Sequence, residues 1–308
     1  MRRKVIQLAG KTSVISLPSG WIRKYSIKKS DELDIEERGN ELIIRTDYPN
    51  KRTSVKLDVG SFSERTLRYC VSALHKSGYD EISLHNVKPQ FSSVINDLVS
   101  CMLLGFVVSE NTEKRIVIKN MAAEDRNEFD SALRRCFLVT LSLADKSLDV
   151  LKGRDVSSSD IIGLEKNNNQ LCSFCLRLIN KGISSNESNH NFLSIVIWTL
   201  EKIADEYKYI SGILNDSKVM INNDTLKLCS ATNDFLKDYY NLFYNFSPAA
   251  LNELNDNKAA LTRMLNNISF TTREDTQIAN HLMTIVSKTS DLSSSIFAIN
   301  HRKVLNNY

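Results

Sequence analysis

Residues 10–18 read Gly10-Lys11-Thr12-Ser13-Val14-Ile15-Ser16-Leu17-Pro18, and this stretch decides how the first part of the chain folds. An apolar stretch, Val5 to Leu8, precedes the glycine and lysine, and a second apolar stretch leads into the proline. The pattern predicts two short strands joined by a turn. One short helix should follow and end near Tyr25, because proline is favoured in the first turn of a helix.

A second hairpin is expected directly after this helix. Residues 32–36 alternate between acidic and apolar types, which predicts a strand with Leu33 and Ile35 on one face. Gly39-Asn40 separates it from Glu41 to Ile44, a spacing typical of a tight β-hairpin. A segment as short as residues 1–47 buries little apolar surface, so we expect a partner chain to complete its core.

The charge of the chain is unevenly distributed. The net charge is only +4, yet residues 1–52 carry 12 basic and 7 acidic side chains, and the remainder is close to neutral. Residues 1–30 contain no acid, and their eight basic residues are Arg2, Arg3, Lys4, Lys11, Arg23, Lys24, Lys28 and Lys29. A basic end on a nearly neutral body indicates a localised site for a polyanion, although clustered charge is also typical of a solvated face.

The middle of the chain alternates between strand and helix patterns. Residues 53–120 predict a small α/β domain, with residues 47–52 as its linker. The expected strands are 53–59, 81–85, 106–109 and 115–118, and the expected helices are 63–76 and 91–104. This segment contains no catalytic motif.

From Ala122 onward the periodicity is helical, and no glycine occurs after Gly212. Ser247 before Pro248 is a strong signal for the start of a helix. Six helices in a three-plus-three order predict two three-helix bundles. The helices are expected near 124–151, 156–181, 190–214, 222–245, 249–267 and 273–299.

Several classes of protein are disfavoured. No apolar stretch approaches the roughly 20 residues that cross a bilayer, and the alternation over residues 5–17 argues against a signal peptide. The six scattered cysteines indicate reduced thiols, and Cys172-x-x-Cys175 lies in an apolar helical run that predicts buried positions. Gly10-Lys11-Thr12-Ser13 lacks the earlier glycine of a P-loop. We therefore expect a cytoplasmic protein that is neither membrane-inserted nor an enzyme.

One pair of carboxylates has the spacing of a candidate metal site. Glu201 and Asp205 are four residues apart, so they share one helix face and can share a hard cation. The alternative is that Lys202 and Lys208 compensate their charge at a solvated surface.

The first 47 residues resemble the AbrB/MazE/SpoVT family of swapped-hairpin DNA-binding domains. The resemblance rests on residues 10–18, the short helix, and the stretch Ile27-Lys28-Lys29-Ser30-Asp31-Glu32-Leu33-Asp34-Ile35. It implies that two chains interlace their hairpins into one β-barrel and present basic residues to DNA.

Residues 124–299 resemble PhoU, a regulator of phosphate uptake built from two three-helix bundles. The Glu/Asp-x-x-x-Asp metal motif of that family matches Glu201 and Asp205, which implies a divalent or trivalent metal ion in the first bundle. Asp160 and Glu165 on the preceding helix are weaker candidate neighbours. In the second bundle only Asp291 of the motif remains, because Ser287 replaces its first carboxylate.

The prediction is thus an α+β multidomain protein. A swapped-hairpin barrel covers residues 1–47, a small α/β domain 53–120, and a pair of three-helix bundles 122–300. The resemblances imply a homodimeric regulator of phosphate uptake that binds duplex DNA through its first domain. The expected DNA-contacting residues are Arg2, Arg3, Lys4, Lys11, Arg23 and Lys24. The alternative is an adaptor that restrains a phosphate transporter or its signalling protein without binding DNA, its first domain serving only dimerisation.

Overall fold

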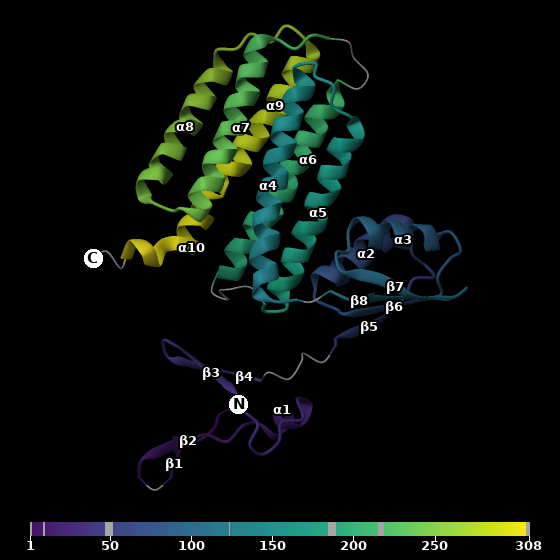
Figure 1. Cartoon of the computed structure of the whole chain (residues 1–308), viewed down its shortest axis with the longest axis vertical. Helices are drawn as coiled ribbons and strands as arrows, with labels where there is room; N and C mark the ends of the chain where they lie inside the picture. The colour runs from purple at the N-terminus through teal and green to yellow at the C-terminus, as the bar shows by residue number, and fades with distance from the viewer. Residues whose placement is uncertain are drawn as a thin grey trace. The chain divides into compact units, whose positions relative to one another are not determined.

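The structure is a computed structural model of the 308-residue chain (Figure 1). It describes residues 2–8, 10–46, 52–122, 124–183, 189–214 and 219–305. The linker predicted over 47–52 falls largely outside the described residues. The chain divides into two compact units, Met1–Thr53 and Ser54–Tyr308.

The first unit consists of two antiparallel hairpins and one short helix. Its elements are β1 (Ile6–Leu8), β2 (Thr12–Val14), α1 (Ser19–Lys24), β3 (Asp34–Arg38) and β4 (Glu41–Arg45). Gly39 has a φ of +59°, a left-handed conformation that glycine adopts without strain, so the two-residue turn predicted at Gly39-Asn40 forms. Both predicted hairpins are confirmed: β1 pairs with β2, and β3 pairs with β4 of the same chain.

The second unit begins with a four-stranded sheet in the order β5-β6-β8-β7. Strand β5 runs parallel to β6, whereas β8 is antiparallel to both β6 and β7. Two helices cover one face of this sheet (Figure 1). The elements are β5 (Ser54–Asp58), α2 (Glu64–Lys76), β6 (Glu81–His85), α3 (Phe91–Cys101), β7 (Phe106–Asn111) and β8 (Arg115–Asn120).

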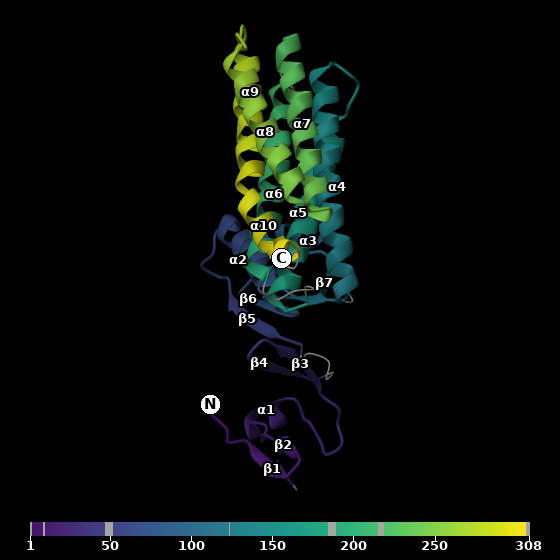
Figure 2. The ribbon, with the colours of Figure 1, turned by 90° about the vertical axis from the view of Figure 1, so that its left-hand side faces the viewer.

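The rest of the second unit is helical, and its long helices run side by side (Figures 1 and 2). Helices α4, α5 and α6 pack against one another, α9 packs on α6 and α7, and α8 packs on α7. Buried side chains from all of them form one continuous core. The bounds are α4 (Arg126–Leu151), α5 (Ser158–Asn180), α6 (His190–Ile213), α7 (Asn223–Tyr244), α8 (Pro248–Asn266), α9 (Arg273–Asp291) and α10 (Ser293–Leu305).

Local signals explain most helix ends. The Ser247 hydroxyl accepts a hydrogen bond from the Ala250 amide at 3.1 Å, and Pro248 occupies the first turn of α8, as predicted. The last helix differs from the prediction, because the helix expected over 273–299 is interrupted at Leu292. Serines follow this position, and their hydroxyls compete for backbone hydrogen bonds, which weakens a helix locally.

Cys172 and Cys175 are fully buried in α5, as the apolar periodicity predicted. The Cys172 sulfur lies 3.8 Å from that of Cys136 on α4. Burial raises the pKa of the Cys136 thiol well above its ordinary value, so this thiol is an inert part of the core. Among the described residues, no helix is both long and apolar enough to span a lipid bilayer.

Candidate functional site

The candidate nucleic-acid interface lies on the first unit. The six side chains expected to contact DNA are all exposed, and they come from three segments of this unit. Arg2, Arg3 and Lys4 precede β1, Lys11 lies in the β1–β2 turn, and Arg23 and Lys24 form the last turn of α1. Exposed guanidinium and ammonium groups are the groups that contact DNA phosphates.

The same unit has no core of its own. None of its described side chains is buried, and several large apolar residues are about half exposed or more. Val5 is 66% exposed and Ile35 is 65% exposed. The others are Ile6, Leu8, Ile15 and Leu42. Since a folded segment gains stability by removing such side chains from water, burial of this apolar surface would stabilise the unit.

The carboxylates predicted to bind metal lie on α6, and each is paired with lysine. The Lys202 ammonium lies 3.0 Å from Glu201 and 3.2 Å from Asp205. The Lys208 ammonium lies 3.0 Å from Asp205 and 2.7 Å from Glu165 on α5. The structure therefore brings Glu165, Glu201 and Asp205 into one cluster with two internal cations, which we call the α6 cluster.

Charge pairing dominates the electrostatics of the α6 cluster. Burial alone would raise the pKa of Asp205, but Lys208 and Lys202 outweigh it and hold that pKa below its ordinary value. Burial would likewise lower the pKa of Lys208, yet Glu165 and Asp205 raise it. Both partners are thus held in their charged forms.

Asp160 is not part of the α6 cluster. Its carboxylate lies 3.7 Å from the ammonium of Lys146 on α4, and its side chain is 55% exposed. In the second half of the helical region, Ser287 and Asp291 are both exposed. The neighbouring Lys288 is instead bound to Glu206 of α6 at 2.5 Å, and His281 contacts the same carboxylate at 2.7 Å.

The α6 cluster as arranged does not fit a metal ion. Within the described ranges, no three or more histidine, cysteine, aspartate or glutamate side chains are grouped so that they could hold one. The ammonium groups of Lys202 and Lys208 lie where a cation would have to sit. One carboxylate oxygen, Glu201 Oε2, is nevertheless buried without a hydrogen-bond partner in the described structure. The metal site stays a prediction, and a cation would have to displace a lysine to bind.

Sequence reasoning missed a buried charge network that joins the sheet to the helices. The fully buried Arg177 of α5 binds Asp80 at 2.5 Å and Glu124 at 2.6 Å. Lys181, one helical turn later, binds the same two carboxylates. The one available signal was an arginine within the apolar run of α5, and nothing in the sequence identified its partners.

Similarity to a known protein family is found in the first unit. Residues 6–53 match the family described as "Antidote-toxin recognition MazE, bacterial antitoxin". No curated protein and no solved structure matches the chain. The first unit is therefore a MazE/AbrB-type, antitoxin-like domain, and the PhoU resemblance of the helical region stays a prediction.

Proposed function

From an antitoxin-like first unit that carries exposed basic residues, we propose that this protein is a homodimeric, DNA-binding transcription regulator rather than an enzyme. The observation that carries the proposal is the family match over residues 6–53. Residues 1–30, which overlap this match, contain no acidic side chain. Two copies would interlace their hairpins, which would cover the exposed apolar side chains of each. The dimer would present both basic sets to duplex DNA.

The helical region would supply the sensor. Its six consecutive long helices, α4 to α9, agree in number with those of the PhoU resemblance, and from that resemblance we infer a role in regulating phosphate uptake. A signal received there would bias the DNA-binding state of the dimer. The rival function is that of an adaptor to a phosphate transporter or its signalling protein, for which the first unit would serve dimerisation only.

Salt-dependent binding of random-sequence duplex DNA tests the proposal. Fluorescence anisotropy over a salt series should give a steep dependence of affinity on salt, because lysine and arginine displace counterions from phosphates. Changing Arg2, Arg3 and Lys11 to Glu should weaken binding by more than tenfold. It should also reduce the logarithmic salt slope by about one unit for each phosphate that the variant no longer neutralises.

A matched variant separates local contacts from net charge. Arg263, Arg273 and Arg302 are exposed in the second unit, so changing them to Glu alters the total charge equally. We expect this control to bind DNA nearly as the original protein does. Unchanged affinity in the Arg2, Arg3, Lys11 variant would rule out the assigned interface and favour the adaptor.

A further inference from the structure

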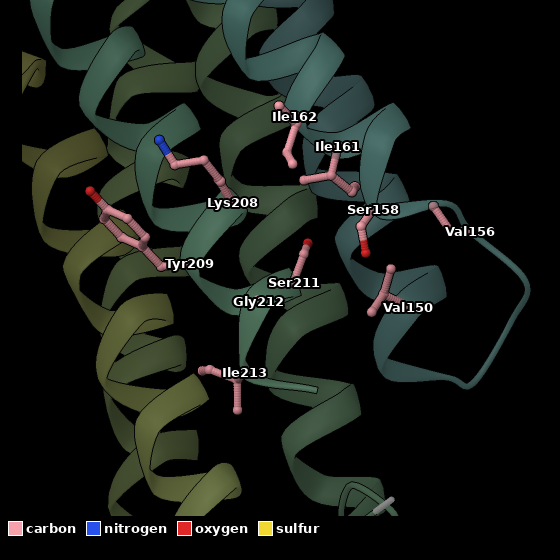
Figure 3. A pocket seen from close by; sticks show the side chains of 10 residues that line it. All are labelled: Val150, Val156, Ser158, Ile161, Ile162, Lys208, Tyr209, Ser211, Gly212 and Ile213. Carbon is pink, nitrogen blue, oxygen red and sulfur yellow. The ribbon is translucent and has the colours of Figure 1, made fainter. Parts of the chain in front are cut away.

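A cavity of about 460 Å³ opens at one end of the helical region (Figure 3). It lies between the end of α4, the first turns of α5 and the last turns of α6. Its volume is within the range of small-molecule sites, which is roughly 300–1,000 Å³.

The walls of the cavity are mainly apolar. Val150 of α4, Ile161 of α5 and Ile213 of α6 contribute aliphatic surface from three different helices (Figure 3). Val156 and Ile162 extend this surface, and Tyr209 also lines the cavity. A ligand that fits must therefore be largely hydrophobic, since polar groups facing these walls would lose their hydrogen bonds to water.

Among the described residues that line the cavity, the one charged side chain is that of Lys208, and it is already paired. The Lys208 ammonium is bound to Glu165 at 2.7 Å and to Asp205 at 3.0 Å, and it points away from the other lining side chains in Figure 3. An anionic ligand would have to approach two carboxylates to reach this ammonium, so the site favours a neutral molecule.

Gly212 is one of the residues that line the cavity. It lies in the last turn of α6, and its φ is not in the left-handed region that requires glycine. A Cβ atom at this position would meet no atom within 4 Å, so packing does not require glycine there either. The space next to its Cα is therefore unfilled, and a larger side chain at this position would extend into it.

We propose that this cavity binds a neutral, largely hydrophobic small molecule as an effector of the helical region. The ligand would lie against Ile161 and Val150 and close to the backbone of Gly212. This inference goes beyond the proposed function and does not depend on DNA binding.

A buried hydrogen-bonded chain connects the cavity to the second half of the helical region. Ser211 in the cavity wall shares a hydrogen bond of 2.9 Å with Ser147 of α4. Ser147 also donates to the carbonyl oxygen of Tyr207, whose hydroxyl donates to Asn233 on α7 at 2.9 Å. Movement of Ser211 on ligand binding would disturb polar groups that have no water to replace their partners.

The test uses the full-length protein and the neutral fluorophore N-phenyl-1-naphthylamine, whose emission rises in apolar surroundings. Gly212→Leu places a side chain in the cavity, whereas Gly163→Leu is a matched control. Gly163 is also a helical glycine, lies on α5, and has no atom within 4 Å of its added Cβ, but it does not line the cavity. Both variants should keep or raise the thermal midpoint, because leucine favours helix over glycine.

We expect Gly212→Leu to raise the dissociation constant of the probe at least tenfold and Gly163→Leu to change it less than twofold. The sulfonated analogue of the probe, 8-anilinonaphthalene-1-sulfonate, should show a weaker component that depends on Gly212. Equal binding by the original protein and Gly212→Leu would overturn the proposal, as would equal losses in both variants or a stronger Gly212-dependent component for the sulfonate. A thermal midpoint lowered by more than about 5 °C in Gly212→Leu would overturn it too, since it would show that the space is not empty.

Discussion

Arg177 is the residue whose environment depends most on the fold. Its guanidinium has no solvent exposure, binds Asp80 and Glu124, and lies 4.9 Å from the centre of the Phe106 ring. It also donates to the carbonyl oxygen of Tyr79 at 2.6 Å. Asp80 is 97 residues away in the sequence, so no local pattern could have identified this pairing.

Replacing Arg177 by methionine should destabilise the protein by about 3–5 kcal/mol, because it removes the guanidinium that pairs with two buried carboxylates. The matched control is Arg154→Met. Arg154 is also paired with an aspartate, but its side chain is 63% exposed, so its loss should cost no more than about 1 kcal/mol. Urea unfolding monitored by circular dichroism measures both values. Similar losses in the two variants would contradict the importance of burial at Arg177.

His75 on α2 gives the protein a pH-dependent stability. Burial lowers its pKa from 6.5 to about 3, and the charge of Arg177 adds to this effect. Because the folded state disfavours the protonated form, stability is complete above pH 6.5 and falls as the pH drops from 6.5 towards 3. Between pH 7 and pH 5 this residue alone should lower the free energy of unfolding by about 2 kcal/mol.

A His75→Phe variant isolates this contribution, since phenylalanine preserves an aromatic ring beside Phe106 and cannot be protonated. The free energy of unfolding of the variant should fall by about 2 kcal/mol less than that of the original protein between pH 7 and pH 5. The same fall in both proteins would exclude His75 as the titrating group.

At the scale of elements, patterns of local sequence predicted the strands and most helices. Short-range signals define these elements: Gly39 permits its turn, and Ser63 caps α2 by accepting a hydrogen bond from Thr66. The break at Leu292 was missed because apolar periodicity continues across it, with Leu292 and Ile296 both buried. Of the candidate site, the exposure of the basic residues was predictable from charge, whereas the cavity depends on how three helices meet.

The α6 cluster should bind divalent cations only in competition with its own lysines. Titration with Mn²⁺ by calorimetry should show at least tenfold tighter binding to a Lys202→Met, Lys208→Met variant than to the original protein. Removing two ammonium groups leaves three carboxylates, and charge count strongly tunes the affinity for such ions. A Glu201→Gln, Asp205→Asn variant should lose binding altogether. Equal affinity of this variant and the original protein for Mn²⁺ would eliminate the site.

At the scale of the whole molecule, the assembly should depend on the first unit. Deleting residues 1–47 should give a mainly helical protein of lower oligomeric state, because the exposed apolar side chains of the first unit would then be absent. Light scattering coupled to size-exclusion chromatography measures the mass, and circular dichroism confirms the helices. Changing only Ile35 and Leu42 to Lys should have a similar effect on mass. An unchanged mass in both proteins would locate the dimer interface elsewhere.

The charge network around Arg177 also determines where this chain can be divided. Composition changes near residue 121, which suggests a boundary between the sheet and the helices. The contacts cross that boundary, since Asn180 donates to the carbonyl oxygen of Lys76, and Gln170 donates to that of Ser100, both at 2.7 Å. A fragment beginning there would leave Arg177 and Lys181 without Asp80. We therefore expect the sheet and the helices to be inherited together in evolution. The junction near residue 53, between the two compact units, is where a domain can be exchanged.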